Sequence, residues 1–349
     1  MENVSVLKPI FSKLLDGVPL SEEETFFIFE SMIRPDASLS DAQIGAYLLA
    51  TASRELAACE IVGAAKSLRK HAIAFDPNGE LSELNILDTC GTGGSGLDTF
   101  NTSTAVAFVL AASGQPVAKH GNKAATSRSG SADVLTALGV NLRHTPAQSR
   151  ALLKKTNFCF LFAPEYHVAT RRVVGIRKEL GFRTIFNFLG PLVSPASPNF
   201  QLLGVSSKSM VRVLAKALGE LGVSRALVVC GEDGLDEISL SAKTNVFELL
   251  DGAVREYQIS PEDVGLSTVS FEKVSGREPE ASAKLMREVL GGEKSAYADL
   301  VAFNAGAALY VSQKSRTIPE GVIQAKDILK TGKALSVLEA VIQESAKNG

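Results

Sequence analysis

The sequence predicts an α/β protein with a mainly parallel sheet flanked by helices, and a second, smaller domain that is all-helical. Apolar residues at helical spacing fill the first 72 residues. From residue 84 onward, short apolar runs alternate with helical segments, which is typical of a parallel sheet covered on both faces. The length of 349 residues favours two domains, because single hydrophobic cores stop growing at roughly 250 to 300 residues.

The N-terminal region has apolar residues at helical spacing and sequence signals for the starts of helices. Ser21 with Glu24, and Ser40 with Gln43, have the spacing of a capping box ahead of an apolar run. The segment "AFDPNGELSE" is typical of a connection, so we expect a helical domain over residues 1–72. Its first apolar residues recur on one helix face: Leu7, Ile10, Phe11, Leu14 and Leu15.

The remainder of the chain alternates between predicted strands and helices. Gly114 and Gly139 follow two of the helical segments, where glycine commonly ends a helix. The predicted strands are "LNILDT" (84–89), "PVAK" (116–119), "FCFLFA" (158–163), "FQLLGVS" (200–206) and "RALVVCG" (225–231). The predicted helices are "STAVAFVLAASG" (103–114), "SADVLTALG" (131–139) and "KSMVRVLAKALGELG" (208–222).

Polar loops follow three of the predicted strands. They are "GTGGSG" after the first strand, "KHGN" at the end of the second and "EDGLDE" after "RALVVCG". Ligands of open α/β sheets bind at the carboxyl ends of strands. We therefore expect the three loops to share one cleft.

The glycine-rich loop suits an anion. Gly91, Gly93 and Gly96 match the dinucleotide pattern G-x-G-x-x-G, but the next strand ends in Lys119 and His120 rather than in the acidic residue that would bind a ribose. A flexible surface turn is the alternative. Glycines let backbone N–H groups approach phosphate oxygens, and further polar groups precede the next helix: Thr99, Asn101, Ser103 and Thr104.

The other two loops add charge. Lys119 stands at a strand end beside Gly121, which allows close approach of a ligand, so a phosphate partner is favoured over a solvated surface cation. His120 either binds the ligand or is a structural hydrogen-bonded residue. The acidic run Glu232, Asp233, Asp236 and Glu237 is either a solvated face or a Mg²⁺ site, since Mg²⁺ takes one or two carboxylates plus substrate phosphates. Together these features indicate a Mg-pyrophosphate substrate. The sequence contains no G-x-x-x-x-G-K-[ST] motif, which disfavours an NTPase.

Charge and cysteine content narrow the function classes. With 36 basic and 38 acidic residues the net charge is −2, which disfavours nucleic acid or an acidic membrane as a partner. The four cysteines show no Cys-x-x-Cys spacing and are expected to be reduced and mostly buried. A signal peptide and a membrane-spanning run are not expected, so the cytoplasm is the expected compartment.

The segment from "GTGGSGLDTFNTSTAV" to "SADVLTALGVNL" resembles the phosphoribosyl-pyrophosphate segment of the anthranilate phosphoribosyltransferase family. "LFAPEYH", "RKELGFRTIFNFLGPLVSPA", "GLDEIS" and "LVAFNAGAALYV" match in the same order, so the resemblance covers nearly the whole chain. It departs from the family at Ser95, where Asp is usual, at Val168, where Pro is usual, and in the stretch "ATASRELAACEI".

The resemblance implies transfer of a phosphoribosyl group from phosphoribosyl pyrophosphate (PRPP) to the amine of anthranilate, with Mg²⁺, in tryptophan biosynthesis. It implies electrostatic stabilisation by Lys119 and the metal, with Ser103, Asp236 and Glu237 serving Mg²⁺. The implied anthranilate residues are Gly91, Asn122, His167, Arg177 and Pro191. The implied PRPP residues are Gly91, Gly94, Ser95, Thr99, Asn101, Thr102, Ser103, Thr104, Lys119, His120, Gly121, Asn122, Lys123, Ser127 and Ser131.

The family also implies a homodimer joined through the helical domain, which gains helices from about residues 166–188. The α/β domain would then comprise residues 73–165 and 189–349. Two related functions stay open: a nucleoside phosphorylase-like enzyme, which would use free phosphate without Mg²⁺, and a non-catalytic relative that binds nucleic acid, which would be strongly basic along one face.

Overall fold

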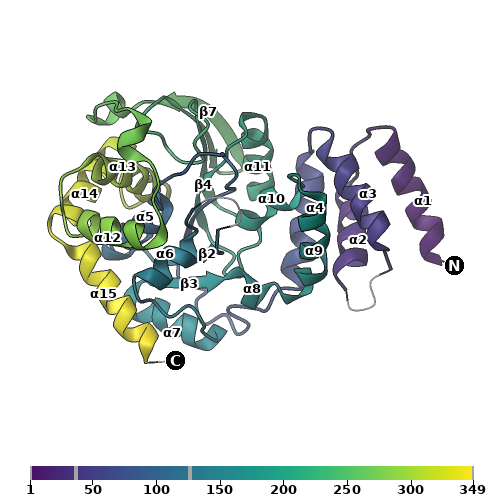
Figure 1. Ribbon diagram of the computed structural model, residues 1–349, viewed down its shortest axis with the longest axis horizontal. Helices are drawn as coiled ribbons and strands as arrows, with labels where there is room; N and C mark the ends of the chain where they lie inside the picture. Colours follow the sequence, from purple (N-terminus) through teal and green to yellow (C-terminus); the bar gives the residue numbers. More distant parts are fainter. Residues whose placement is uncertain (1, 35–37, 125–127, 348–349) are drawn as a thin grey trace.

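The computed structural model describes residues 2–34, 38–124 and 128–347. Figure 1 shows a group of N-terminal helices on one side and a sheet with its surrounding helices on the other. Among the described residues, no helix is long and apolar enough to cross a membrane.

The N-terminal helices begin where the capping signals predict. In α2 and α3 the side chains of Ser21 and Ser40 accept from the backbone N–H groups of Glu24 and Gln43, and both capping boxes are complete. This confirms the prediction of helices over the first 72 residues. Their bounds are Glu2–Leu15 (α1), Glu22–Ile33 (α2), Asp41–Ala52 (α3) and Ala58–Lys70 (α4).

The described sheet has seven strands in the order β3-β2-β1-β4-β5-β6-β7. The first five in this order run parallel, whereas β6 and β7 are antiparallel. The mainly parallel sheet predicted from the sequence is confirmed. The strand bounds are Leu87–Gly91 (β1), Val117–Gly121 (β2), Phe158–Phe162 (β3), Phe200–Gly204 (β4), Arg225–Gly231 (β5), Thr244–Leu250 (β6) and Ala253–Ile259 (β7).

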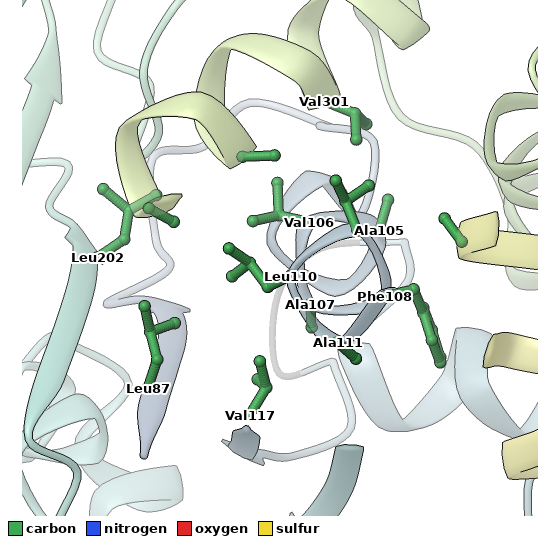
Figure 2. Packing of buried hydrophobic residues seen from close by; sticks show 14 of the residues in the cluster. Leu87, Ala105, Val106, Ala107, Phe108, Leu110, Ala111, Val117, Leu202 and Val301 are labelled. Atoms are coloured by element: carbon green, nitrogen blue, oxygen red, sulfur yellow. The ribbon is translucent and has the colours of Figure 1, made fainter. Parts of the chain in front are cut away.

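Helices cover both faces of the sheet. Successive residues of β4 point to opposite faces, with Leu202 in the cluster around α5 and α13 and Leu203 in the cluster around α4 and α11. Figure 2 shows Leu87, Val117 and Leu202 converging on the apolar helix α5. The helix bounds are Thr102–Ala112 (α5), Ser131–Ala137 (α6), Pro146–Thr156 (α7), Lys208–Glu220 (α11), Pro279–Leu290 (α12), Ala296–Val311 (α13), Ile318–Lys330 (α14) and Lys333–Ala346 (α15).

Short helices between β3 and β4 return the chain to the N-terminal helices. Helix α9 packs against α2 and α3, and α10 packs against α4. The division into two domains at residue 72 stays a prediction. The bounds of these elements are Ala163–Tyr166 (α8), Val168–Thr170 (η1), Arg171–Leu180 (α9), Phe186–Leu189 (α10) and Gly190–Leu192 (η2). Two further 3₁₀ helices are η3 (Pro261–Val264) and η4 (Phe271–Val274). Cys159 and Cys230 are buried, whereas Cys59 and Cys90 are partly exposed.

Helices α13 and α14 approach each other closely at a pair of glycines. A Cβ on Gly306 would overlap the backbone of Val322, and a Cβ on Gly321 would overlap the carbonyl of Gly306.

Gly306→Ala should therefore lower the free energy of unfolding by about 2 kcal/mol through overpacking, which thermal unfolding would reveal as a lower Tm. The matched control is Gly45→Ala in α3, where a Cβ meets no atom within 4 Å and helix propensity favours alanine. Equal Tm changes in both variants would contradict the close contact.

Candidate active site

A cavity of about 560 Å³ lies at the carboxyl ends of the parallel strands. Strand order reverses between β1 and β4, because β2 and β3 lie beyond β1 while β5 lies beyond β4. Such a switch point is where open α/β sheets bind their ligands. The loops after β1, β2 and β5 all line the cavity, so the prediction of a shared cleft is confirmed.

Two paired glycines allow the acidic loop to cross the strand ends. Gly91 of β1 is the register partner of Gly204 of β4. A Cβ on Gly204 would overlap the backbone carbonyl of Asp236, and a Cβ on Gly91 would overlap the Asp236 carboxylate. The Oδ2 atom of Asp236 accepts from the N–H of Gly93 at 2.8 Å. The glycine-rich loop and the acidic loop are therefore in direct contact.

Lys119 brings a buried cation to the cavity. Its side chain is only 2% exposed, and its Nζ donates to the carbonyl of Thr89 and, at 3.0 Å, to Oγ of Ser103. Burial lowers the pKa of Lys119, and the nearby carboxylate of Asp88 opposes that change. Asp88, a residue of β1, is fully buried, and burial raises its pKa to about 6.

Glu237 faces the N-terminus of α5. Burial raises the pKa of Glu237 to about 8, and hydrogen bonds from the Thr102 side chain and the Ser103 backbone oppose the rise. Its Oε2 atom is buried and has no hydrogen-bond partner among the described residues. Burial also raises the pKa of Asp236. A cation placed beside these two buried carboxyl groups would stabilise their charged forms.

This donor set fits Mg²⁺. Within the described residues, no group of three or more His, Cys, Asp or Glu side chains could hold a metal. The site instead offers the two carboxylates of Asp236 and Glu237 beside the hydroxyl of Ser103. Mg²⁺ characteristically takes one or two carboxylates and completes its shell with water and substrate phosphates.

Two histidines lie in contact beside the cavity. The rings of His120 and His167 are 5.2 Å apart, and Nδ1 of His120 donates to the carbonyl of Gly190 at 3.1 Å. The Nε2 atoms of both rings are buried without a partner in the described parts of the chain. Burial lowers the pKa of His120 to about 3 and that of His167 to about 4. Both rings are therefore neutral at pH 7.

The structure brings most of the predicted residues to this cavity. Those that line it are Gly91, Gly94, Thr99, Asn101, Ser103, Thr104, Lys119, His120, Gly121, Asn122, Lys123, Ser131, Asp236 and Glu237. Ser127 falls outside the described residues.

Five predicted residues stand back from the cavity wall. Ser95 turns its Oγ toward the N–H of Leu97, and the hydroxyl of Thr102 donates to the carbonyl of Phe100. The other three are His167 behind His120, Pro191 in η2, and Arg177, whose guanidinium lies 5.1 Å from the centre of the Phe186 ring.

Sequence reasoning missed Arg183. Its guanidinium donates to the carbonyls of Gly94 at 2.9 Å and Gly93 at 3.2 Å, and to Oγ of Ser206 at 3.2 Å. Arg183 therefore ties the glycine-rich loop to the segment after β4. Asn187 of α10, also missed, lines the same cavity. Both lie in the segment "GFRTIFNFLG", whose sequence carries no pattern that places it beside a loop about 90 residues earlier.

Comparisons with known proteins agree with this architecture. Residues 83–335 match the glycosyl transferase family, a/b domain, and residues 8–72 match its helical bundle domain. An anthranilate phosphoribosyltransferase from Phenylobacterium zucineum is 44% identical over 339 residues, which cover 97% of this chain and 98% of that protein. The chain belongs to the anthranilate phosphoribosyltransferase family.

Solved structures of the family have the same fold. The enzyme from Thermus thermophilus aligns with a TM-score of 0.89 and 39% identity, covering 96% of this chain and 98% of that chain. The Saccharomyces cerevisiae enzyme in complex with PRPP and Mg aligns with a TM-score of 0.87 and 31% identity, covering 99% and 98% of the two chains. Another structure of the yeast enzyme is in complex with 4-fluoroanthranilate.

The neutral histidine pair predicts an acid limit to stability. An unfolded chain protonates these histidines as the pH falls through their ordinary value of 6.5, whereas the folded chain resists until about pH 4 for His167 and about pH 3 for His120. The unfolded state then binds more protons, so stability falls with decreasing pH between 6.5 and 4 by about 1.4 kcal/mol per pH unit for each histidine.

Denaturant unfolding across this pH range measures that slope. His167→Asn should reduce the slope of the unfolding free energy against pH by up to the contribution of one proton. The pH dependence above pH 7 should stay unchanged, which serves as the internal control. An unaltered slope in the variant would show that His167 is protonated in the folded chain.

Proposed function

We propose that this chain transfers the phosphoribosyl group of PRPP to the amine of anthranilate, giving N-(5-phosphoribosyl)anthranilate and pyrophosphate. The observation that carries the proposal is the meeting of a glycine-rich anion loop, the buried Lys119 and two adjacent carboxyl groups at the switch point of the sheet. The family membership and the ligands held by the yeast structures support it.

The glycine-rich loop and Lys119 would bind and orient the pyrophosphate. Backbone N–H groups of the loop and hydroxyls at the start of α5 donate to phosphate oxygens. As the bond between ribose C1 and the pyrophosphate oxygen breaks, negative charge grows on the leaving group, and Lys119 stabilises it from a buried position. The anthranilate nitrogen would form the new bond to C1 directly, so no covalent nucleophile is required, and the proton that the nitrogen loses would leave with the pyrophosphate.

Asp236, Glu237 and Ser103 would hold Mg²⁺ together with the substrate's own oxygens. The ion supplies additional positive charge to the pyrophosphate when it is bound. Before binding, Asp236 accepts from Gly93 and Glu237 keeps one unpartnered oxygen. The N–H of Gly93 and the Asp236 carboxylate therefore satisfy each other until the substrate complex arrives.

Arg177 would bind the carboxylate of anthranilate. Burial lowers the pKa of its guanidinium, and within the described structure it pairs with no carboxylate. A planar guanidinium suits a benzoate carboxylate. His167, Pro191, Asn122 and Gly91 complete the proposed acceptor path.

Neither alternative fits these observations as well. A phosphorylase using free phosphate has no need for the Asp236 and Glu237 pair, which suits a metal. A nucleic-acid-binding relative needs an excess of positive charge, whereas the net charge here is −2.

A homodimer through the helical domain and a cytoplasmic location remain part of the proposal. Exposed apolar residues on and beside the N-terminal helices support the first: Val6, Leu15, Val18 and Leu49.

The decisive assay follows the fluorescence of anthranilate with PRPP and Mg²⁺. We expect anthranilate to be consumed only when all three are present, with one pyrophosphate released per anthranilate. Phosphate-dependent cleavage of a nucleoside, without anthranilate consumption, would instead identify a phosphorylase.

The acidic pair should control the metal dependence. Asp236→Asn combined with Glu237→Gln removes both charges at nearly constant volume, so turnover should fall by orders of magnitude and the Mg²⁺ titration should weaken while the far-UV circular dichroism is retained. Glu232→Gln, on the exposed start of the same loop, is the matched control. An unchanged Mg²⁺ titration in the double variant contradicts the assignment.

Arg177 and Lys119 should affect different substrates. Arg177→Ala loses a charge-assisted bond worth about 1.5–3 kcal/mol, so kcat/KM for anthranilate should fall roughly tenfold to somewhat over a hundredfold with little change in the KM for PRPP. Lys119→Ala should affect PRPP or abolish turnover. Steady-state kinetics with each substrate varied in turn separates the two, and wild-type anthranilate kinetics in Arg177→Ala would exclude this acceptor site.

A further inference from the structure

A second cavity lies away from the active site, where the helical region joins the sheet. It has a volume of about 500 Å³ and is bordered by the end of α4, the segment from residue 72 to residue 86 that leads to β1, and the turn 193–199 that leads to β4. Polar and apolar side chains share its walls, and Phe75, Leu81, Ile86 and Pro195 are among the apolar ones.

Arg69 brings an uncompensated cation to this cavity. Its Nε donates to the carbonyl of Leu192 at 2.7 Å and its Nη1 to the carbonyl of Leu221 at 3.0 Å. Burial alone lowers the pKa of Arg69 to about 10, and no carboxylate of the described residues pairs with it. An unpaired buried charge is costly, and an anion can offset that cost.

Two other arginines that are largely withdrawn from water have acidic partners. Arg54 pairs with Glu60 at 2.5 Å, and Arg150 pairs with Glu80 at 3.1 Å. Among the described residues, the other arginine whose pKa is lowered by burial alone is Arg177, the residue proposed above to bind a carboxylate. Arg69 therefore has the electrostatic character of an anion-binding residue rather than that of a structural ion pair.

The wall also contains a buried hydroxyl without a hydrogen-bond partner in the described structure, and a turn with a left-handed residue. Ser194 is only 1% exposed, and its Oγ has no hydrogen-bond partner within the described residues. Ser197 has a φ of +43°, in the left-handed region that non-glycine residues rarely adopt and that clusters at functional sites. Both residues line the cavity.

The remaining charges near the cavity are already satisfied. Lys70 pairs with Glu30 at 2.9 Å. The oxygens of Asp76 accept from the N–H of Glu80 at 3.0 Å and of Leu81 at 2.8 Å, so its negative charge is taken up within its own turn. In the part of the chain that the structure describes, Arg69 is left without a carboxylate partner and Ser194 with an unpartnered hydroxyl.

We propose that this cavity binds a small organic carboxylate with an apolar body, its carboxylate held by Arg69 and Ser194 and its body by the apolar walls. The volume lies within the range of small-molecule sites. The site is independent of the proposed catalytic function, because its wall shares no residue with the catalytic cavity.

A single tryptophan can report binding at this site. The chain contains no tryptophan, and Ser82 is exposed at the cavity wall, so Ser82→Trp places one indole there. The probes are benzoate and 3-phenylpropionate, with benzamide as the neutral isostere of benzoate. We expect a saturable change in indole fluorescence with both carboxylates, and binding of benzamide at least about tenfold weaker.

The two unpaired arginines provide matched variants in this reporter background. Arg69→Gln should weaken benzoate binding at least about tenfold, whereas Arg177→Gln should leave the response unchanged. Arg69→Lys keeps the charge and should retain measurable binding, which keeps the test valid if Arg69→Gln does not fold. Absence of a saturable response, equal binding of benzamide, or a response lost only in Arg177→Gln would each overturn the proposal.

Discussion

The passage of Asp236 across the ends of β1 and β4 is the contact on which the site depends. Gly91 and Gly204 are paired in register, and neither position has space for a Cβ. This close approach lets the loop after β5 reach the loop after β1, although a strand lies between them. The glycine-rich loop and the acidic loop are thereby joined by the Asp236 contact with Gly93.

The buried charges of the site are arranged for a ligand rather than for stability. Lys119 and Glu237 are both withdrawn from water, and burial shifts each pKa toward the neutral form. Leaving such groups incompletely paired costs folding free energy. A magnesium–pyrophosphate complex would supply a cation to the carboxylates and an anion to the lysine. Binding of this complex would offset the free-energy cost of burying these groups.

Sequence patterns predict local structure here and miss what depends on distant contacts. Apolar runs and polar loops located β1 to β5 and the cleft at their ends. The strands β6 and β7 were missed, although the Asp251-Gly252 dipeptide between them, with both φ angles positive, is a hairpin signal. Arg183 was missed for a different reason: its role comes from contacts with Gly93, Gly94 and Ser206, and no spacing in the sequence encodes them.

The segment that leads from α10 toward β4 passes the surroundings of the catalytic cavity and then the wall of the second cavity. After α10 the chain passes Gly190, whose carbonyl accepts from His120, then Leu192, whose carbonyl accepts from Arg69, and then Ser194 in the wall of the second cavity. Within five residues the segment thus contacts His120, which lines the catalytic cavity, and then Arg69, which lines the second cavity. Any displacement of this segment changes the surroundings of His120 and of Arg69 together, so the histidine pair beside the active site and the buried cation of the second cavity report on the same piece of backbone.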